Sequence, residues 1–335
     1  MKAVPIADDD TFRQLVERHR PELHLHCYRM LGSLQDAEDV VQETLLRAWR
    51  ARNAFGGRAS PRTWLYKIAT NACLDVLRQR SKRRLPVGYG SPADPRFPGA
   101  EPRPEVSWLE PYPDSLLDLI DQRAGPDARY DSHESVELAF LAAVQHLSSR
   151  QRAVLLLRDV LEWSASETAG LLETSIASVN SALQRAREAM KRQLPAGAES
   201  FVSQIPARDT RREIADQYRQ AWEAADIHRL AALLKEDVTL SMPPVPSWYL
   251  GRAAVAEFLV RNPLAPEWQR RLRLHPTGAN RRPAFATYHR EDNSDVFRPF
   301  GLMTLRIEGE MIAEVLGFVD PTLFRFFDLP AMLSS

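Results

Sequence analysis

Apolar side chains recur every three or four positions along residues 62–84, which predicts an amphipathic helix with one buried face. The apolar positions are Trp64, Leu65, Ile68, Ala69, Ala72, Cys73, Val76 and Leu77. The opposite face carries Arg62, Lys67, Thr70, Asn71 and Arg78, and the pattern continues into Arg80, Lys82, Arg83 and Arg84. Because Asn71 is an amide that can bond a base edge and its neighbours are cations, this face suits a nucleic acid. A charged face exposed to water explains the same pattern, so both interpretations stay open here.

Two further helices are predicted upstream. The first covers about residues 11–31 and has to accommodate Pro21. The second begins at Asp36 and ends before Phe55, with acidic side chains at its start, where the helix dipole favours negative charge. Its apolar stripe consists of Val40, Val41, Thr44, Leu45, Ala48 and Trp49. Residues 10–85 are therefore expected to form one all-α domain.

The regular pattern breaks between residues 86 and 133, where nine of the 24 prolines lie. This stretch has 4 basic and 9 acidic side chains, whereas residues 1–85 have 16 basic and 10 acidic ones. We expect an extended, mostly irregular acidic linker that follows a basic domain, and the basic domain suggests a polyanionic partner. Within the linker, residues 108–114 (WLEPYPD) are too aromatic for a passive tether and are expected to dock on a further surface, which this pattern does not identify.

Residues 134–195 return to a helical pattern. Ser148 with Gln151, and Ser164 with Glu167, have the spacing of helix-capping boxes. A short helix at 165–172, a tight turn at 173–175 and a longer amphipathic helix predict a helix-turn-helix. The outward face of the second helix shows Ser175, Ala177, Ser178, Asn180, Ser181, Gln184, Arg185 and Arg187. These side chains suit entry into a DNA major groove, although a purely structural helical hairpin has the same pattern.

From about residue 206 to 330 the pattern predicts an α+β domain, with helices first and a curved antiparallel sheet afterwards. Helices are expected at 214–234 and 252–259. Strands are expected at 238–242, 272–275, 283–288, 301–307 and 311–318.

Composition narrows the class of protein. The chain has 335 residues, of which 44% are hydrophobic and 26% charged, as expected for a globular protein of several domains. Cys27 and Cys73 are the only cysteines, so a disulfide scaffold or a zinc site is not expected. We find no signal-peptide pattern, no apolar run of membrane-spanning length and no nucleotide-binding glycine loop. A cytoplasmic protein without a cofactor, a metal or a membrane partner is the expectation.

Four stretches, in order along the chain, resemble the extracytoplasmic-function (ECF) sigma factors of bacterial RNA polymerase. They are residues 36–49, 62–78, 147–160 and 163–187. Residues 208–330, with SMPPVPSWYLGRAAVAEFL at 241–259, resemble the SnoaL-like (NTF2-like) fold, a cone that encloses a pocket. The resemblance implies sigma domains at 10–85 and 134–195, the linker at 86–133, and the cone at 206–330. It implies a promoter-specificity subunit whose partners are core RNA polymerase and promoter DNA.

The resemblance also implies roles for individual residues. Core polymerase would be bound by Asp39, Gln42 and Glu43. The −10 element would be bound by Arg62, Lys67, Asn71, Arg78 and Arg80, with Asn71 lining the pocket for a base taken out of the stack. The −35 element would be bound by Ser175, Ser178, Asn180, Ser181, Gln184 and Arg185. The recognition helix begins with small rather than basic residues, a departure from the family that leaves room for shape readout.

The C-terminal domain offers Trp248, Tyr249 and His289 as candidate pocket residues, with Trp268, Tyr288 and Asp320 as further aromatic and polar candidates. His289 and Asp320 form the one acid–base pair that could be nominated, but aromatic core residues and a surface histidine explain the same positions. No catalytic residue is therefore assigned, and the protein is not expected to be an enzyme.

We expect the C-terminal domain to tune sigma activity in place of a separate anti-sigma factor, whose existence the sequence leaves open. The alternatives are a SnoaL-type cyclase or isomerase fused to a DNA-binding sensor, and a ligand-sensing helix-turn-helix repressor.

Overall fold

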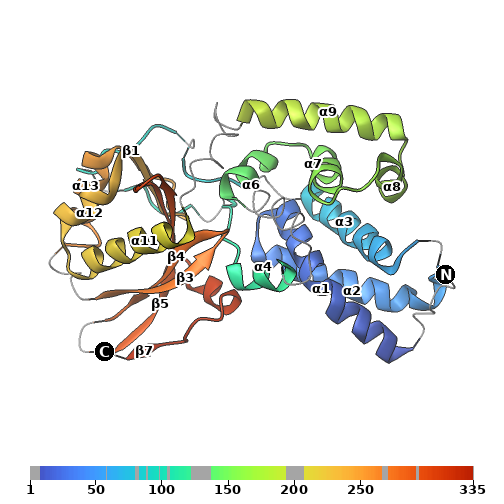
Figure 1. Ribbon diagram of the computed structural model, residues 1–335, viewed down its shortest axis with the longest axis horizontal. Coiled ribbons are helices and arrows are strands. Elements are labelled where there is room, and N and C mark those ends of the chain that lie inside the picture. Colours follow the sequence, from blue (N-terminus) through green and yellow to red (C-terminus); the bar gives the residue numbers. More distant parts are fainter. Residues whose placement is uncertain are drawn as a thin grey trace. The chain divides into compact units, whose positions relative to one another are not determined.

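The computed structural model describes residues 8–57, 59–79, 83–87, 90–97, 99–103, 106–121, 137–193, 207–265, 271–291 and 294–334. The chain forms two compact units (Figure 1). The first unit combines Met1–Arg83 with Leu116–Pro195, and the second combines Arg84–Ser115 with Ala196–Ser335. The segment 84–115 therefore folds with the C-terminal part of the chain, although in sequence it lies between the two N-terminal helical regions.

The first unit opens with three helices, α1 (Asp9–Leu31), α2 (Leu34–Ala51) and α3 (Pro61–Gln79), and a short 3-10 turn, η1 (Arg52–Ala54), follows α2. Side chains cap the first two helices, because Asp8 accepts a hydrogen bond from the Thr11 N–H and Ser33 accepts one from the Asp36 N–H. Gly32 ends α1 with φ at 72°, a left-handed conformation that glycine adopts without strain. The buried faces meet in a core that includes Leu23, Tyr28, Met30, Leu34, Val41, Leu65 and Tyr66.

The second helical region follows α4 (Asp114–Asp121) and consists of α6 (Leu138–Gln145), α7 (Ser149–Leu155), the π-helical turn η2 (Leu156–Val160), α8 (Ala165–Leu171) and α9 (Ile176–Gln193). Both predicted capping boxes are present, one at Ser148 and one at Ser164. The helix-turn-helix packs on a core that includes Leu147, Leu155, Val179, Leu183 and Ala186. Helix α4 lies inside the stretch that the sequence predicted to be mostly irregular.

The second unit contains the helices α11 (Arg208–Glu223), α12 (Ile227–Leu233) and α13 (Arg252–Arg261). Its strands are β1 (Leu234–Ser241), β2 (Trp248–Leu250), β3 (Leu272–Ala279), β4 (Arg282–His289), β5 (Val296–Glu308), β6 (Met311–Phe318) and β7 (Leu333–Ser334), and a 3-10 turn, η3 (Pro321–Phe326), follows β6. The strand order is β2-β1-β6-β5-β4-β3, and β7 pairs with β5. The expected all-antiparallel sheet was wrong in one place, because β1 and β6 run parallel.

The sheet bends where the register of β4 and β5 shifts between Thr287 and Tyr288, as expected for a bulge that increases curvature. Gly301 faces Thr287 there, and a Cβ at this glycine would lie 2.3 Å from the Phe318 carbonyl oxygen. The helices cover the concave face, and the Tyr218 ring of α11 stacks on Phe285 of β4 with ring centroids 6.3 Å apart. The sheet and the helices thus form a cone around an apolar interior.

Cys27 and Cys73 are both buried and free, and burial raises the pKa of the Cys73 thiol. Within the described residues, no helix has the length and apolar character needed to cross a bilayer.

Candidate functional site

The exposed face of α2 carries the three residues expected to bind polymerase. Asp39 and Gln42 are exposed and Glu43 is half-buried, and their spacing places them on one side of the helix. Intrahelical contacts orient them, since Gln35 Nε2 donates to Asp39 Oδ1 at 2.8 Å and Arg47 Nε donates to Glu43 Oε1 at 2.6 Å.

An apolar residue lies on the same side of α2. Leu46 is 51% exposed and continues the i, i+3, i+4, i+7 spacing of the three polar residues. The sequence analysis missed this leucine, although its position opposite the buried stripe could have revealed it. The surface combines carboxylates with an exposed leucine, and such a mixture suits a protein partner that supplies arginines and an apolar contact.

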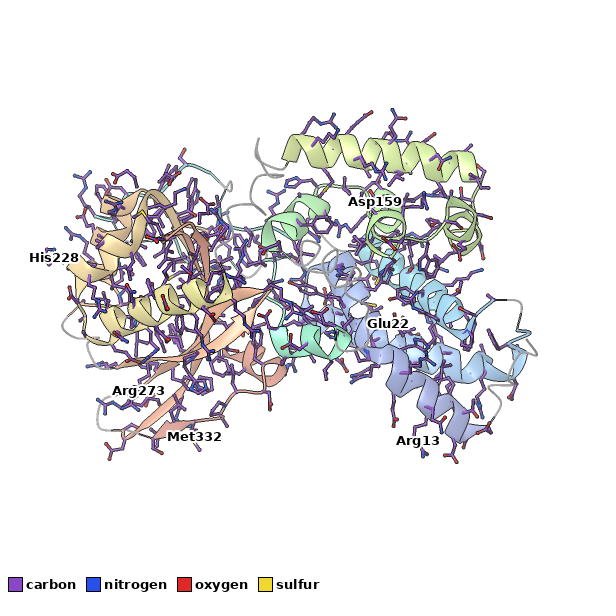
Figure 2. All side chains as sticks on the ribbon, viewed as in Figure 1. Arg13, Glu22, Asp159, His228, Arg273 and Met332 are labelled. Atoms are coloured by element: carbon purple, nitrogen blue, oxygen red, sulfur yellow. The ribbon has the colours of Figure 1, made fainter. Side chains whose placement is uncertain are left out.

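The polar face of α3 begins with an internal ion pair. Arg62 Nε donates to Glu22 Oε2 at 2.9 Å, and its guanidinium lies 4.9 Å from the centre of the Tyr66 ring. Burial by itself would raise the pKa of Glu22, but hydrogen bonds from His19 and Arg62 lower it on balance. Glu22, labelled in Figure 2, lies on α1. In this state Arg62 is therefore engaged by a carboxylate rather than free for a phosphate.

The remaining −10 candidates on α3 have different surroundings. Lys67 Nζ lies 2.9 Å from Glu173 Oε1, in the turn between α8 and α9. Asn71, one helical turn further along the same face, is half-buried. Arg78 is exposed and donates to Asp75 Oδ1 at 2.8 Å. Arg80 lies outside the described residues.

The two helical regions of the first unit share a buried contact. The Tyr66 ring of α3 lies 5.4 Å from the Trp163 ring, which immediately precedes α8. Arg152 of α7 is buried and donates to the Met30 carbonyl oxygen at the end of α1, and also to the side chain of Gln145 at 2.8 Å. Burial lowers the pKa of Arg152 to about 10. The helix-turn-helix thus covers part of the α3 face that is expected to bind DNA.

The recognition helix α9 keeps its candidate residues at the surface. All six −35 candidates are exposed, opposite the buried face that holds Val179 and Leu183. Ser175 Oγ accepts a hydrogen bond from the Ser178 N–H at 3.1 Å and so caps the helix start. Next to these candidates, Arg187 forms two hydrogen bonds with Asp159, at 2.9 and 2.7 Å.

In the second unit, the linker residues 108–114 are built into the turn between β3 and β4. The Tyr112 N–H donates to Asn280 Oδ1 at 2.8 Å, and the Asn280 N–H donates to the Tyr112 carbonyl oxygen at 2.9 Å. The Arg281 N–H donates to Asp114 Oδ1 at 2.8 Å. Leu109 and Tyr112 are fully buried. The prediction that this aromatic segment docks is confirmed.

The β3–β4 turn has a backbone suited to this contact. Asn280 and Arg281 have φ of 53° and 60°, the pattern of a tight hairpin turn in which asparagine is favoured. A Cβ at Gly278 would lie 2.5 Å from Asp114 Oδ2, so the carboxylate can approach only because this residue is glycine.

The cone contains a cavity of about 370 Å³. Its described lining is mostly apolar and includes Trp222, Leu240, Met242, Val245, Phe258, Leu302, Met303, Val315 and Phe318, with Gly99 and Ala100 contributed by the linker. Tyr249 lines this cavity, whereas Trp248 and His289 are not among the lining residues.

The structure explains why Tyr249 lines the cavity and Trp248 does not. Side chains alternate along a strand, so Trp248 and Tyr249 face opposite sides of β2, and the Trp248 indole donates to the Gly90 carbonyl oxygen at 3.2 Å. His289 is the last residue of β4, and its ring lies 6.1 Å from the Phe300 ring of β5.

The further pocket candidates have other roles. Tyr288 donates to the Pro330 carbonyl oxygen at 2.7 Å. Asp320 caps η3 by accepting a hydrogen bond from the Thr322 N–H at 2.9 Å. Trp268 lies outside the described residues.

Three family models match the chain: Sigma-70 region 2 at residues 15–83, Sigma-70 region 4 at residues 137–190, and the SnoaL-like domain at residues 215–315. Together with a close relative that spans nearly the whole chain, they show that the chain belongs to the ECF RNA polymerase sigma factors. It is thus a sigma factor with a fused C-terminal SnoaL-like domain.

That relative is ECF RNA polymerase sigma factor SigG of Mycobacterium tuberculosis, which is 46% identical over 323 residues, 96% of this chain and 85% of SigG. SigJ of the same organism is 30% identical over 226 residues, 67% of this chain and 62% of SigJ. The crystal structure of M. tuberculosis SigJ matches with a TM-score of 0.59 at 20% identity, covering 95% of this chain and 100% of that one. This similarity supports the same fold.

Proposed function

We propose that this sigma factor controls itself through its linker, which the C-terminal domain holds until initiation requires its release. The observation that carries the proposal is the insertion of residues 108–114 into the β3–β4 turn. The protein would act in the cytoplasm, with core RNA polymerase and promoter DNA as partners and without chemistry of its own.

Residue roles follow from the surfaces. Asp39, Gln42 and Glu43 would meet cationic side chains of core polymerase, and Leu46 would add an apolar contact at the same surface. Asn71 would line the pocket for an unstacked −10 base, because a protein that melts DNA without ATP has to bind the open strand better than the duplex.

The packing within the first unit supports a closed resting state. The −35 and −10 elements are about 25 base pairs apart, which is about 85 Å of duplex at roughly 3.4 Å per base pair. In the structure, α3 and the helix-turn-helix touch through Lys67 and Glu173 and through Tyr66 and Trp163. In this arrangement, one molecule could not bind the −10 and −35 elements of one promoter at the same time. The two regions therefore have to separate before they engage it.

Linker capture supplies a second restraint on initiation, besides the packing within the first unit. The resemblance to ECF sigma factors implies that the linker passes through the polymerase near the RNA exit path. A linker bound to the C-terminal domain is not available to take that path. The three hydrogen bonds between residues 112–114 and the β3–β4 turn contribute about 0.5–1.5 kcal/mol each. Several kcal/mol is enough to hold the linker, yet small enough for polymerase binding to overcome.

The side chains that line the cavity favour a regulatory role over the cyclase or isomerase alternative. Among its described lining residues, the titratable side chains are Tyr249 and Arg261, with no carboxylate or histidine. General acid–base catalysis most often uses a histidine or a carboxylate next to the reacting atoms, and arginine does not give up its proton at neutral pH. The repressor alternative has no use for the Sigma-70 region 2 match at residues 15–83.

Run-off transcription with core polymerase tests the proposal. Asn280→Gly keeps the positive φ of the turn but removes the acceptor for the Tyr112 N–H, and Glu310→Ala is a matched polar change in the exposed β5–β6 turn. We expect Asn280→Gly to raise transcript yield by about tenfold, the effect of about 1.4 kcal/mol, and Glu310→Ala to leave it unchanged. Hydrogen exchange at residues 109–112 reports whether the linker was released. A released linker with unchanged transcription would refute the proposal.

A further inference from the structure

We propose that the cavity of the C-terminal cone binds a neutral, largely hydrocarbon small molecule with one or two hydrogen-bonding groups. We define the strap as the described linker residues 90–97 and 99–103. The bound molecule would fasten the strap over the cavity. This ligand site stands on its own geometry, and only its effect on transcription rests on the function proposed above.

The cavity walls select for a neutral ligand. Most of the surface comes from leucine, methionine, valine and phenylalanine side chains of β1, β5, β6 and α13. The described lining has no Asp, Glu, His or Lys, and its Arg261 is half exposed and paired with Glu257 at 2.9 Å. An anionic or cationic ligand would lose its hydration without meeting a buried counter-charge, whereas a hydrocarbon gains by burial. A cavity of about 370 Å³ is within the size range of small-molecule sites.

A few polar groups can orient such a molecule. Thr287 of β4 is buried and lines the cavity. The Tyr249 ring stacks on Phe258 with centroids 4.4 Å apart, and its hydroxyl lies 3.7 Å from the position a Cβ would take on Gly99. The Tyr249 hydroxyl thus sits where cavity and strap meet. Sparse hydrogen-bonding groups in an apolar wall are typical of sites that bind mainly by burial.

The strap is attached by hydrogen bonds to the first residue of β2 and to the loop that precedes it. The Ala93 N–H donates to the Trp248 carbonyl oxygen at 2.7 Å, the Ala100 N–H to Ser247 Oγ at 2.9 Å, and the Arg103 N–H to the Pro244 carbonyl oxygen at 3.1 Å. Gly99 and Ala100 line the cavity, yet both residues are largely exposed to solvent. Gly99 and Ala100 of the strap therefore form one wall of the cavity, while Ala93 packs against the core.

This geometry links ligand binding to the linker. A molecule that fills the cavity touches Gly99 and Ala100 only while the strap is docked, so it binds the docked form better. By linkage, the ligand stabilises the docked form by the same free energy. In the proposed function, the ligand would act as a corepressor, because it would keep the linker bound to the C-terminal domain for longer.

Nile red, a neutral apolar dye, is the probe for the site in the full chain. We expect saturable binding at one site, with fluorescence enhancement, and dye-dependent protection from hydrogen exchange at Ala93, Ala100 and Arg103. Gly99→Trp directs an indole toward Tyr249 and Ser247 and should weaken binding by about tenfold or more, the loss expected when the site is filled. Ser91→Trp, at an exposed strap position that does not line the cavity, is the control and should bind as the unmodified chain does.

A second variant guards against misfolding. Ser247→Ala removes the acceptor for the Ala100 N–H and leaves the core in place, so dye affinity should fall severalfold with loss of protection at Ala100. Equal binding by Gly99→Trp and Ser91→Trp, non-saturable binding, or binding without strap protection would each overturn the inference. These measurements use no polymerase. If dye binding behaves as expected while Asn280→Gly leaves transcription unchanged, the regulatory function fails and the ligand site stands.

Discussion

Lys67 Nζ and Glu173 Oε1 lie 2.9 Å apart, and this ion pair joins the DNA-facing side of α3 to the turn of the helix-turn-helix. Both side chains are substantially exposed, at 40% and 75%, so water and salt screen the pair and it contributes little to the packing. The buried contacts of Tyr66 and Arg152 contribute more to the packing. The closed state therefore combines a firm apolar contact with a weak electrostatic one that a polyanion can replace.

Reversing the charge at Glu173 should open the first unit. Glu173→Lys replaces attraction to Lys67 by repulsion, and we expect the full chain to bind a promoter duplex about threefold more tightly. Glu162→Lys is the control, because Glu162 is exposed just before the helix-turn-helix and has a similar positive φ of 55°. Fluorescence anisotropy with labelled duplex measures both. Equal gains in the two variants would show that added positive charge, and not opening, is the cause.

The acidic face of α2 should determine polymerase capture. Asp39→Arg with Glu43→Arg reverses two carboxylates spaced four residues apart, and repulsion from a basic partner should weaken binding to core enzyme by about tenfold or more. Asp209→Arg with Glu213→Arg makes the same change at the same spacing on exposed positions of α11. Binding is measured by surface plasmon resonance on immobilised core enzyme. An identical loss from both pairs would contradict the assignment.

Asn71→Ala should impair DNA opening without impairing assembly. Loss of the amide removes contacts to the unstacked base, so permanganate reactivity of −10 thymines in the holoenzyme complex should fall by about tenfold. Binding to core enzyme should not change. Gln217→Ala, at an exposed amide on α11, should leave both measurements unaltered. Normal opening by Asn71→Ala would remove this residue from the −10 site.

Gly278→Ala should release the linker from the β3–β4 turn. The new Cβ would lie 2.5 Å from Asp114 Oδ2, so Asp114 has to move and its hydrogen bond to the Arg281 N–H is lost. We expect linker docking to weaken by about 1–3 kcal/mol, seen as faster hydrogen exchange at residues 109–114. Gly170→Ala in α8 is the matched control, because nothing lies within 4 Å of its Cβ position. Unchanged exchange in Gly278→Ala would mean that the turn tolerates the clash.

Acid should destabilise the first unit through two buried histidines of α1. Burial lowers the pKa of His24 to about 4 and that of His26 to about 3, and His26 also bonds Thr70 of α3 at 2.9 Å. In the unfolded chain the two histidines take up protons near pH 6.5, whereas in the folded unit they do not. Above that pH, protonation therefore takes nothing from the free energy of unfolding. The free energy of unfolding falls between pH 6.5 and 4, by about 1.4 kcal/mol per pH unit for each histidine.

Hydrogen exchange of α3 amides, expressed as protection factors at pH 7.5 and 5.5, measures this loss. His26→Gln should reduce the dependence on pH. His228→Gln, at the exposed histidine of α12 labelled in Figure 2, should leave it unchanged. A flat profile in the unmodified chain would show that the histidines do not titrate between the folded and unfolded states.

Local patterns predicted the helices and their caps well, because those signals lie within a few residues. The Ser148 and Ser164 boxes form as expected, and Pro21 is accommodated inside α1. Residues 108–114 could be recognised as a docking segment from their aromatic content, but the residues that they contact could not. Asn280 lies 168 residues from Tyr112, and nothing in either local sequence encodes the pairing.

The sequence analysis failed where distant segments meet. The parallel pairing of β1 with β6 depends on the course of the whole sheet, so alternation within each strand could not reveal it. Alternation within β2 also could not decide which side chain lines the cavity: Tyr249 does and Trp248 does not, and the choice depends on the paired register of the strand. The contacts that cover α3 likewise come from residues about a hundred positions away, such as Glu173 and Trp163.

The division of the chain into discontinuous units has a practical consequence for building hybrid sigma factors. Transplanting the SnoaL-like domain alone, cut at about residue 196, would strip the graft of Leu109 and Tyr112 and leave its β3–β4 turn uncovered. A workable graft has to carry 84–115 with it, threaded between the two promoter-binding parts of the recipient. Transfer of this domain between sigma factor genes therefore requires three junctions, at 83/84, 115/116 and 195/196, and not a single one before residue 196.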